Sequence, residues 1–265
     1  HTSATGYKEF TISKATPVVE SPKLTDLAYQ DGMTLAANQP LPAGSGWAWD
    51  APATPLSAGI VKANATYTPA DTANYNTVKR ELTFTVNQAE GSITITGDPS
   101  KTYDGTAVSD PTVERSGTGA VTYAYYAGTD TSAAPLASAP KDAGGYTVAA
   151  TVADDGNHTS ATGYKEFAIS KATPDVNSPE LKTLTYQDGM TLAANQPLPV
   201  GSGWTWDKPD TALSAGTVKA NATYTPADTA NYNTVTRELT FTVSQAAGSI
   251  TITGDPSKTY DGTAV

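Results

Sequence analysis

The sequence contains no cysteine and only two histidines, His1 and His158. Without cysteine, the chain can form neither disulfides nor thiolate metal sites. The two histidines are copies of one repeat position in a polar loop, so a serine–histidine–aspartate triad would have to use that loop. The carboxylates are scattered over predicted turns rather than paired. We therefore expect no enzymatic activity and no cofactor.

Charge is also scarce, and basic charge most of all. Charged residues make up 16% of the chain, with 16 Lys and Arg against 26 Asp and Glu and a net charge of -10. Nucleic-acid binding needs clustered cations, so it is not expected, and neither is attraction to an anionic membrane surface. No apolar run approaches the roughly 20 residues of a membrane span. We expect no membrane insertion in this segment.

A long internal repeat organises the sequence. His1 to Phe10 returns as His158 to Phe167, and the match continues without a gap to Val108 and Val265. The period is too long for a solenoid unit of about 20 to 50 residues, so each repeat should hold more than one domain.

Two different patterns alternate within the repeat, and we refer to them as A and B modules. The A modules cover 15–89 and 172–246, and the complete B module covers 90–171. Residues 1–14 have the sequence of the last strand of B, and residues 247–265 that of its beginning. Neither fragment is long enough to bury a core of its own. We expect the chain to be a window on a longer fibre, or its ends to pack on neighbours.

Alternating apolar residues predict strands in both modules. In A, the runs Val61–Tyr67 and Leu82–Val86 alternate with period two, as half-buried strands do. In B, alternation recurs at Ile93–Ile95, Val121–Tyr125 and Tyr146–Val152, and an Asp-Gly turn signal lies at Asp104. Only residues 31–38 suggest a helical turn.

The expected fold class is therefore all-β. We expect tandem small β-sandwich or β-grasp-like modules, joined end to end as an elongated rod. The linkers are short, and proline at 174 restricts its own backbone and the preceding residue, which favours an extended junction.

The motifs resemble repeats of bacterial surface proteins. Lys101-Thr102-Tyr103-Asp104-Gly105-Thr106 is similar to the signature of the YDG repeat. The A module resembles MBG and bacterial Ig-like repeats through Lys14-Ala15-Thr16-Pro17, Trp47-Ala48-Trp49 and Tyr67-Thr68-Pro69. The resemblance implies a large extracellular adhesin, attached to the cell surface or cell wall, in which such repeats form a stalk and carry no catalytic residues.

Paired tryptophans are the candidate ligand-binding residues. Trp47 and Trp49 lie two apart in a predicted strand, so both rings face one side, and Trp204 and Trp206 are their copies. They either form a platform on which a sugar ring stacks, or fill the core or a domain interface. The second interpretation is favoured, because the A module has few other large apolar groups.

A calcium site is a weaker candidate. Asp154, Asp155 and Asn157 could supply oxygen ligands at a domain edge, although the spacing is not that of an EF-hand. Asp and Asn are also ordinary turn formers, and the favoured expectation is that no metal binds.

Three functions remain open at this point. The favoured one is a structural stalk or spacer that projects a distal binding region, with neighbouring repeats of the same chain as its partners. The alternatives are repeats that bind a host glycan or protein multivalently, or that pair with like chains between cells or fibres.

Overall fold

A computed structural model describes residues 1–254 and 257–262. The chain divides into two compact units. The first unit comprises residues 1–100, 107–140 and 145–168. The second comprises residues 101–106, 141–144 and 169–265. Each is described below by itself.

The first A module, in the first unit, is built on a four-stranded sheet with one short helix. Its elements are β1 (Leu27–Ala28), α1 (Leu35–Asn38), β2 (Trp47–Trp49), β3 (Gly59–Tyr67) and β4 (Val78–Asn87). The strand order is β1-β4-β3-β2, with β1 parallel to β4 and the other two pairs antiparallel. The expected helical turn is confirmed at α1.

The core of this sheet lies on the face to which its alternating apolar residues point. Trp49 of β2, Ala65 of β3, and Leu82, Phe84 and Val86 of β4 are buried. Leu35 of α1 lies in the same core cluster, with 1% of its surface exposed. The period-two pattern of β3 and β4 thus produces one buried and one exposed face, as the sequence predicts.

The B module carries a second four-stranded sheet and a two-stranded one. Its strands are β5 (Ile93–Ile95), β6 (Lys101–Thr102), β7 (Val113–Arg115), β8 (Val121–Ala127), β9 (Gly144–Val152) and β10 (Ala161–Ser170). The large sheet has the order β6-β10-β9-β8, and β5 pairs with β7. The last two residues of β10 belong to the second unit, where they pair in parallel with β6.

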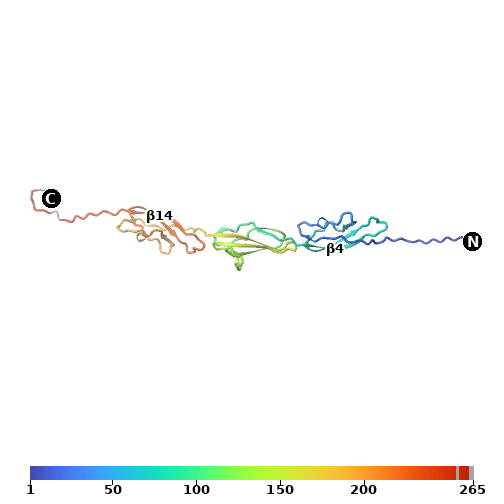
Figure 1. The fold of residues 1–265 in the computed structure, drawn as a ribbon. Helices are drawn as coiled ribbons and strands as arrows, with labels where there is room; N and C mark the ends of the chain where they lie inside the picture. Colours follow the sequence, from blue (N-terminus) through green and yellow to red (C-terminus); the bar gives the residue numbers. More distant parts are fainter. Residues whose placement is uncertain (255–256, 263–265) are drawn as a thin grey trace. The chain divides into compact units, whose positions relative to one another are not determined.

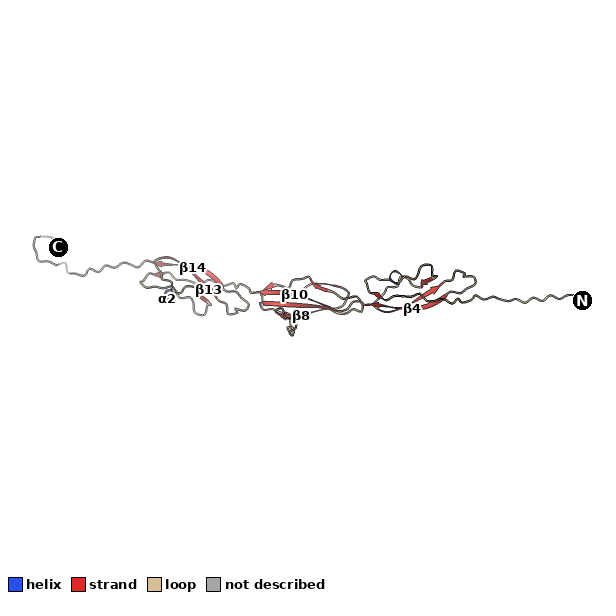
Figure 2. Cartoon of the chain, in the orientation of Figure 1, coloured by secondary structure: helices blue, strands red, loops and turns tan. Residues whose placement is uncertain are grey.

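The second A module, in the second unit, repeats the first. It contains β11 (Leu184–Thr185), α2 (Leu192–Asn195), β12 (Trp204–Trp206), β13 (Gly216–Tyr224) and β14 (Val235–Ser244). The order is β11-β14-β13-β12, and β13 runs antiparallel to β14 over nine residue pairs. Figure 2 labels both strands in this module.

All three large sheets share one strand order, although A and B differ in sequence. In each, the first strand pairs in parallel with the last, the last adjoins the one before it, and the remaining strand closes the far edge. The predicted all-β class is confirmed. In the described part of the chain, no helix is long and apolar enough to cross a membrane.

The N-terminal segment shows that burial depends on neighbouring strands. Residues 1–13 run as an extended trace without strand pairing (Figure 1), and Phe10 and Ile12 are 83% and 84% exposed. Their copies in β10, Phe167 and Ile169, are 6% and 2% exposed. The same residues are therefore core residues only where β6 and β9 are present beside them.

Candidate functional site

Hydrogen-bonded polar side chains lie where one module follows another. In the first unit, the 154–158 loop of the B module meets the first A module. The Asn157 side-chain oxygen accepts a hydrogen bond from the Ala58 N–H at 2.8 Å. The Gln88 amide donates to both carboxylate oxygens of Asp154, at 3.1 and 3.0 Å. Residues 88–91, which link the A module to the B module, are thus held by hydrogen bonds.

Asp155 organises this loop from within. One carboxylate oxygen accepts the N–H groups of Asn157 and His158 at 2.9 and 2.7 Å, and the other accepts the Thr118 N–H at 2.7 Å. These backbone donors, the Thr118 N–H first, hold the pKa of the Asp155 carboxyl well below its usual range. The loop is therefore a pre-formed structure rather than a free turn.

His158 is buried at this junction, with 8% of its surface exposed. Its ring stands edge-on to Tyr29 of the A module, with centroids 5.4 Å apart. Nδ1 lies 3.5 Å from an Asp155 oxygen, and Nε2 lies 4.0 Å from Asp31. Among the described residues, Nδ1 is the buried side-chain atom without a hydrogen-bond partner. The sequence placed His158 in a polar loop and did not reveal this packing.

The junction in the second unit has different residues but a similar construction. The Tyr103 ring of the B module stands edge-on to Tyr232 of the second A module, with centroids 5.3 Å apart. The Ala143 N–H donates to the Asn231 side-chain oxygen at 2.7 Å, and Asn231 is only 8% exposed. Burial, followed by the nearby Asp228 carboxylate, raises the pKa of Tyr103.

The linker that leads into the second A module is also fixed. Lys171 donates to the Thr229 carbonyl at 2.6 Å. The Ala172 N–H donates to the Asn231 carbonyl at 2.9 Å, and the Asn233 N–H donates back to the Ala172 carbonyl at 2.8 Å. Asn231 thus contacts both the linker and the preceding module.

The predicted tryptophans lie mainly in the cores. Trp49, Trp204 and Trp206 are buried, and Trp47 is partly buried against Tyr67. The indole N–H groups of Trp49 and Trp206 each donate to a backbone carbonyl at 2.8 Å. Sugar stacking needs an accessible ring face, so these positions suit core packing better than ligand binding. The ligand-binding interpretation stays a prediction.

The predicted calcium ligands already have protein partners. Asp154 binds Gln88 and the Gly156 N–H, Asp155 binds three backbone N–H groups, and Asn157 binds Ala58. Within residues 1–254 and 257–262, no group of three or more His, Asp or Glu side chains is arranged to hold a metal ion. The loop hydrogen bonds account for these residues without a cation.

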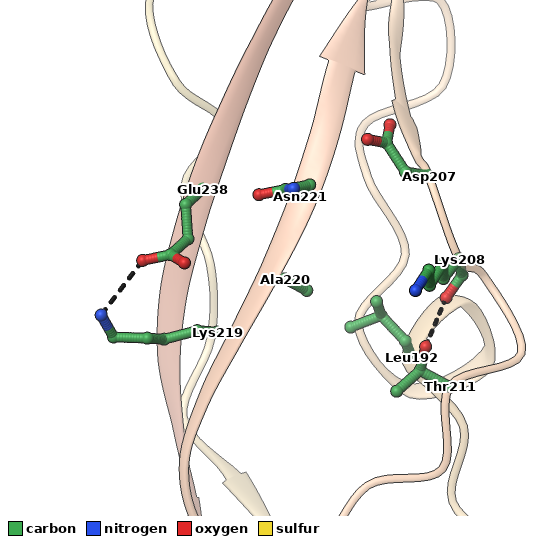
Figure 3. Close-up of a pocket in the computed structure, with 8 residues that line it drawn as sticks. All are labelled: Leu192, Asp207, Lys208, Thr211, Lys219, Ala220, Asn221 and Glu238. Atoms are coloured by element: carbon green, nitrogen blue, oxygen red, sulfur yellow. Dashed lines mark hydrogen bonds and ion pairs between the residues drawn. The ribbon is translucent and has the colours of Figure 1, made fainter.

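A cavity of about 300 Å³ lies beside α2 in the second unit (Figure 3). Three of its four charged lining residues have partners. Lys219 binds Glu238 at 3.1 Å, and Asp207 accepts the Thr223 hydroxyl at 2.7 Å. Lys208, which lines this cavity, corresponds to Ala51 in the first A module, so the two A modules differ at this position. We assign no chemistry to the cavity, because Lys219 and Glu238 pair with each other and the Asp207 carboxylate is bound by Thr223.

Comparison with known proteins supplies no family. No protein-family model matches the chain, and a search of curated proteins finds no match either.

Proposed function

We propose that this chain is a structural stalk, or spacer, of a bacterial cell-surface adhesin or extracellular fibre. It would project a distal binding region from the cell, act outside the cell, and perform no catalysis. The observation that carries the proposal is that both linkers are held by hydrogen bonds and that an edge-on aromatic contact lies at each junction.

A stalk needs stiff junctions, because flexible linkers would let its modules fold back on one another. In the proposed arrangement, the modules follow end to end as a rod. Strands of nine and ten residues, at about 3.3 Å each, make a module about 30–40 Å long, so an A–B pair would add about 70 Å. The parallel pairing of first and last strands and the short helix favour the β-grasp-like alternative over a two-sheet sandwich.

The test is small-angle X-ray scattering of the 265-residue chain, combined with a binding screen on immobilised glycans, mucin and matrix proteins. The proposal expects no saturable binding and a maximum dimension of at least about 90–120 Å, because three modules of about 30–40 Å follow end to end. A compact particle would refute the rod, and a hit that free sugar competes away would refute the pure spacer.

Glycan binding is the second candidate, favoured by one observation. A hollow of about 290 Å³ in the first A module is lined by Trp47, Tyr67, Pro22 and Pro42. Aromatic and proline surfaces in such a hollow suit the apolar face of a sugar ring. If this candidate holds, Trp47→Ala abolishes glycan binding while the circular dichroism spectrum and unfolding transition of the chain persist.

A further inference from the structure

The two A modules carry an identical loop with different surroundings. Residues 69–76 and 226–233 have the same sequence, Pro-Ala-Asp-Thr-Ala-Asn-Tyr-Asn. In the second copy, the B module covers the loop, because Tyr103 packs on Tyr232 and Ala143 bonds to Asn231. In the first copy, Asn74 is exposed and Tyr75 is 42% exposed.

Both loops nevertheless have the same internal structure. The Asp71 carboxylate accepts the Asn74 N–H at 3.1 Å and the Asn74 side-chain amide at 2.8 Å. In the second copy, Asp228 accepts the same groups of Asn231 at 3.1 and 2.9 Å. The first loop thus already has the conformation that the second loop has beneath the B module. Docking of a module on the first loop would therefore require little additional ordering.

The incoming chain is also held in the same way at both loops. Lys14 donates to the Thr72 carbonyl at 2.7 Å, as Lys171 does to Thr229 at 2.6 Å. The Ala15 N–H donates to the Asn74 carbonyl at 2.9 Å, which matches Ala172 and Asn231. Residues 1–14 repeat the sequence of 158–171 except for threonine at position 11, so the segment that enters the first A module has the sequence of β10 and its linker.

We propose that Asn74 and Tyr75 form a docking site for a second B-type module, a further copy of the sequence 90–171. In the docked state, the Tyr103 of that copy stands edge-on to Tyr75, and its Ala143 N–H donates to the Asn74 side-chain oxygen. No described residue donates to that oxygen in the present chain, whereas its counterpart in Asn231 accepts at 2.7 Å. The partner is specified by a tyrosine ring and one backbone N–H at matched positions.

The test uses a lengthened chain in which a copy of residues 90–157 precedes His1, so that residues 1–14 complete a B-type module. Nuclear magnetic resonance should show the Asn74 side-chain amide and the Tyr75 ring signals moving toward those of Asn231 and Tyr232. The amide of the added alanine equivalent to Ala143 should be protected from exchange, and Asn74→Ala should accelerate its exchange about five- to thirty-fold.

A matched control replaces the tyrosine of the added copy that is equivalent to Tyr103 with alanine, which should return the Tyr75 signals to their positions in the 265-residue chain. Unchanged Asn74 and Tyr75 signals beside a folded added module would overturn the proposal. Failure of the added copy to fold with residues 1–14 would overturn it too, since the partner would then not be a complete B-type module.

This inference rests on the proposed tandem arrangement but not on the absence of a ligand. Glycan binding by the chain would reject the spacer and leave the docking site intact. Unchanged signals would reject the docking site while the length and the negative binding screen still supported the spacer.

Discussion

Asn231→Ala is the most direct test of whether the second-unit junction is held as described. The Asn231 oxygen accepts the Ala143 N–H at 2.7 Å, and the residue is only 8% exposed. The substitution leaves that N–H without its acceptor, which costs about 1–3 kcal/mol for a buried donor. Ala143 is only partly buried, so water can reach it in part, and we expect about 1–2 kcal/mol.

That free energy corresponds to about five- to thirty-fold faster exchange of the Ala143 amide, because 1.4 kcal/mol is a factor of ten. Hydrogen–deuterium exchange followed residue by residue measures it in the 265-residue chain. A local probe is needed because several cooperative units make a single unfolding free energy ill defined.

Asn74→Ala is the matched control, because the same side chain lies in the same loop without a covering module. It should leave the exchange of Ala143 unchanged and loosen only the loop around Asp71. If Asn231→Ala changes the Ala143 rate by less than about twofold, the hydrogen bond does not hold the junction and the argument for stiffness fails.

Three further predictions concern the module cores and the 154–158 loop. Trp206→Ala removes a buried side chain and should lower the unfolding free energy of the second A module by about 3–5 kcal/mol. Thr205→Ala, on the exposed face of β12, should change that free energy by less than about 0.5 kcal/mol. Differential scanning calorimetry of the two variants compares their unfolding transitions. Gly119→Ala should destabilise the B module, because a Cβ would overlap the Ala153 carbonyl, whereas Gly145→Ala has free space; equal melting temperatures would contradict this. The pKa of Asp155 is depressed in the folded chain, so its contribution to stability is complete above the unfolded pKa of about 4 and is lost progressively as the pH falls below that value through the lower folded pKa. Asp155→Asn should abolish this part of the acid sensitivity of Thr118 amide exchange. An unchanged pH profile in the variant would count against it.

Much of the local structure follows from residue order alone. Alternation at Val61–Tyr67 and Leu82–Val86 places one side chain in two on a single face, and the structure has β3 and β4 there. Asp104-Gly105 predicts a turn because glycine tolerates positive φ, and Gly105 has a φ of 78°. Strand alternation and turn signals depend on neighbours within a few residues, so they can be predicted from a single sequence.

Burial and the junctions depend on residues far apart in the chain. Phe10 and Phe167 occupy identical ten-residue sequences, yet one is exposed and the other buried, because only the second has β6 and β9 beside its strand. The loops of Asn74 and Asn231 differ in the same way, since only Asn231 accepts the Ala143 N–H and only its neighbour Tyr232 has the Tyr103 ring against it. Composition, alternation and the repeat thus determined the all-β class and the places where strands form. The tertiary structure alone decided which copy of each residue is covered, because burial requires a partner surface that local sequence cannot specify.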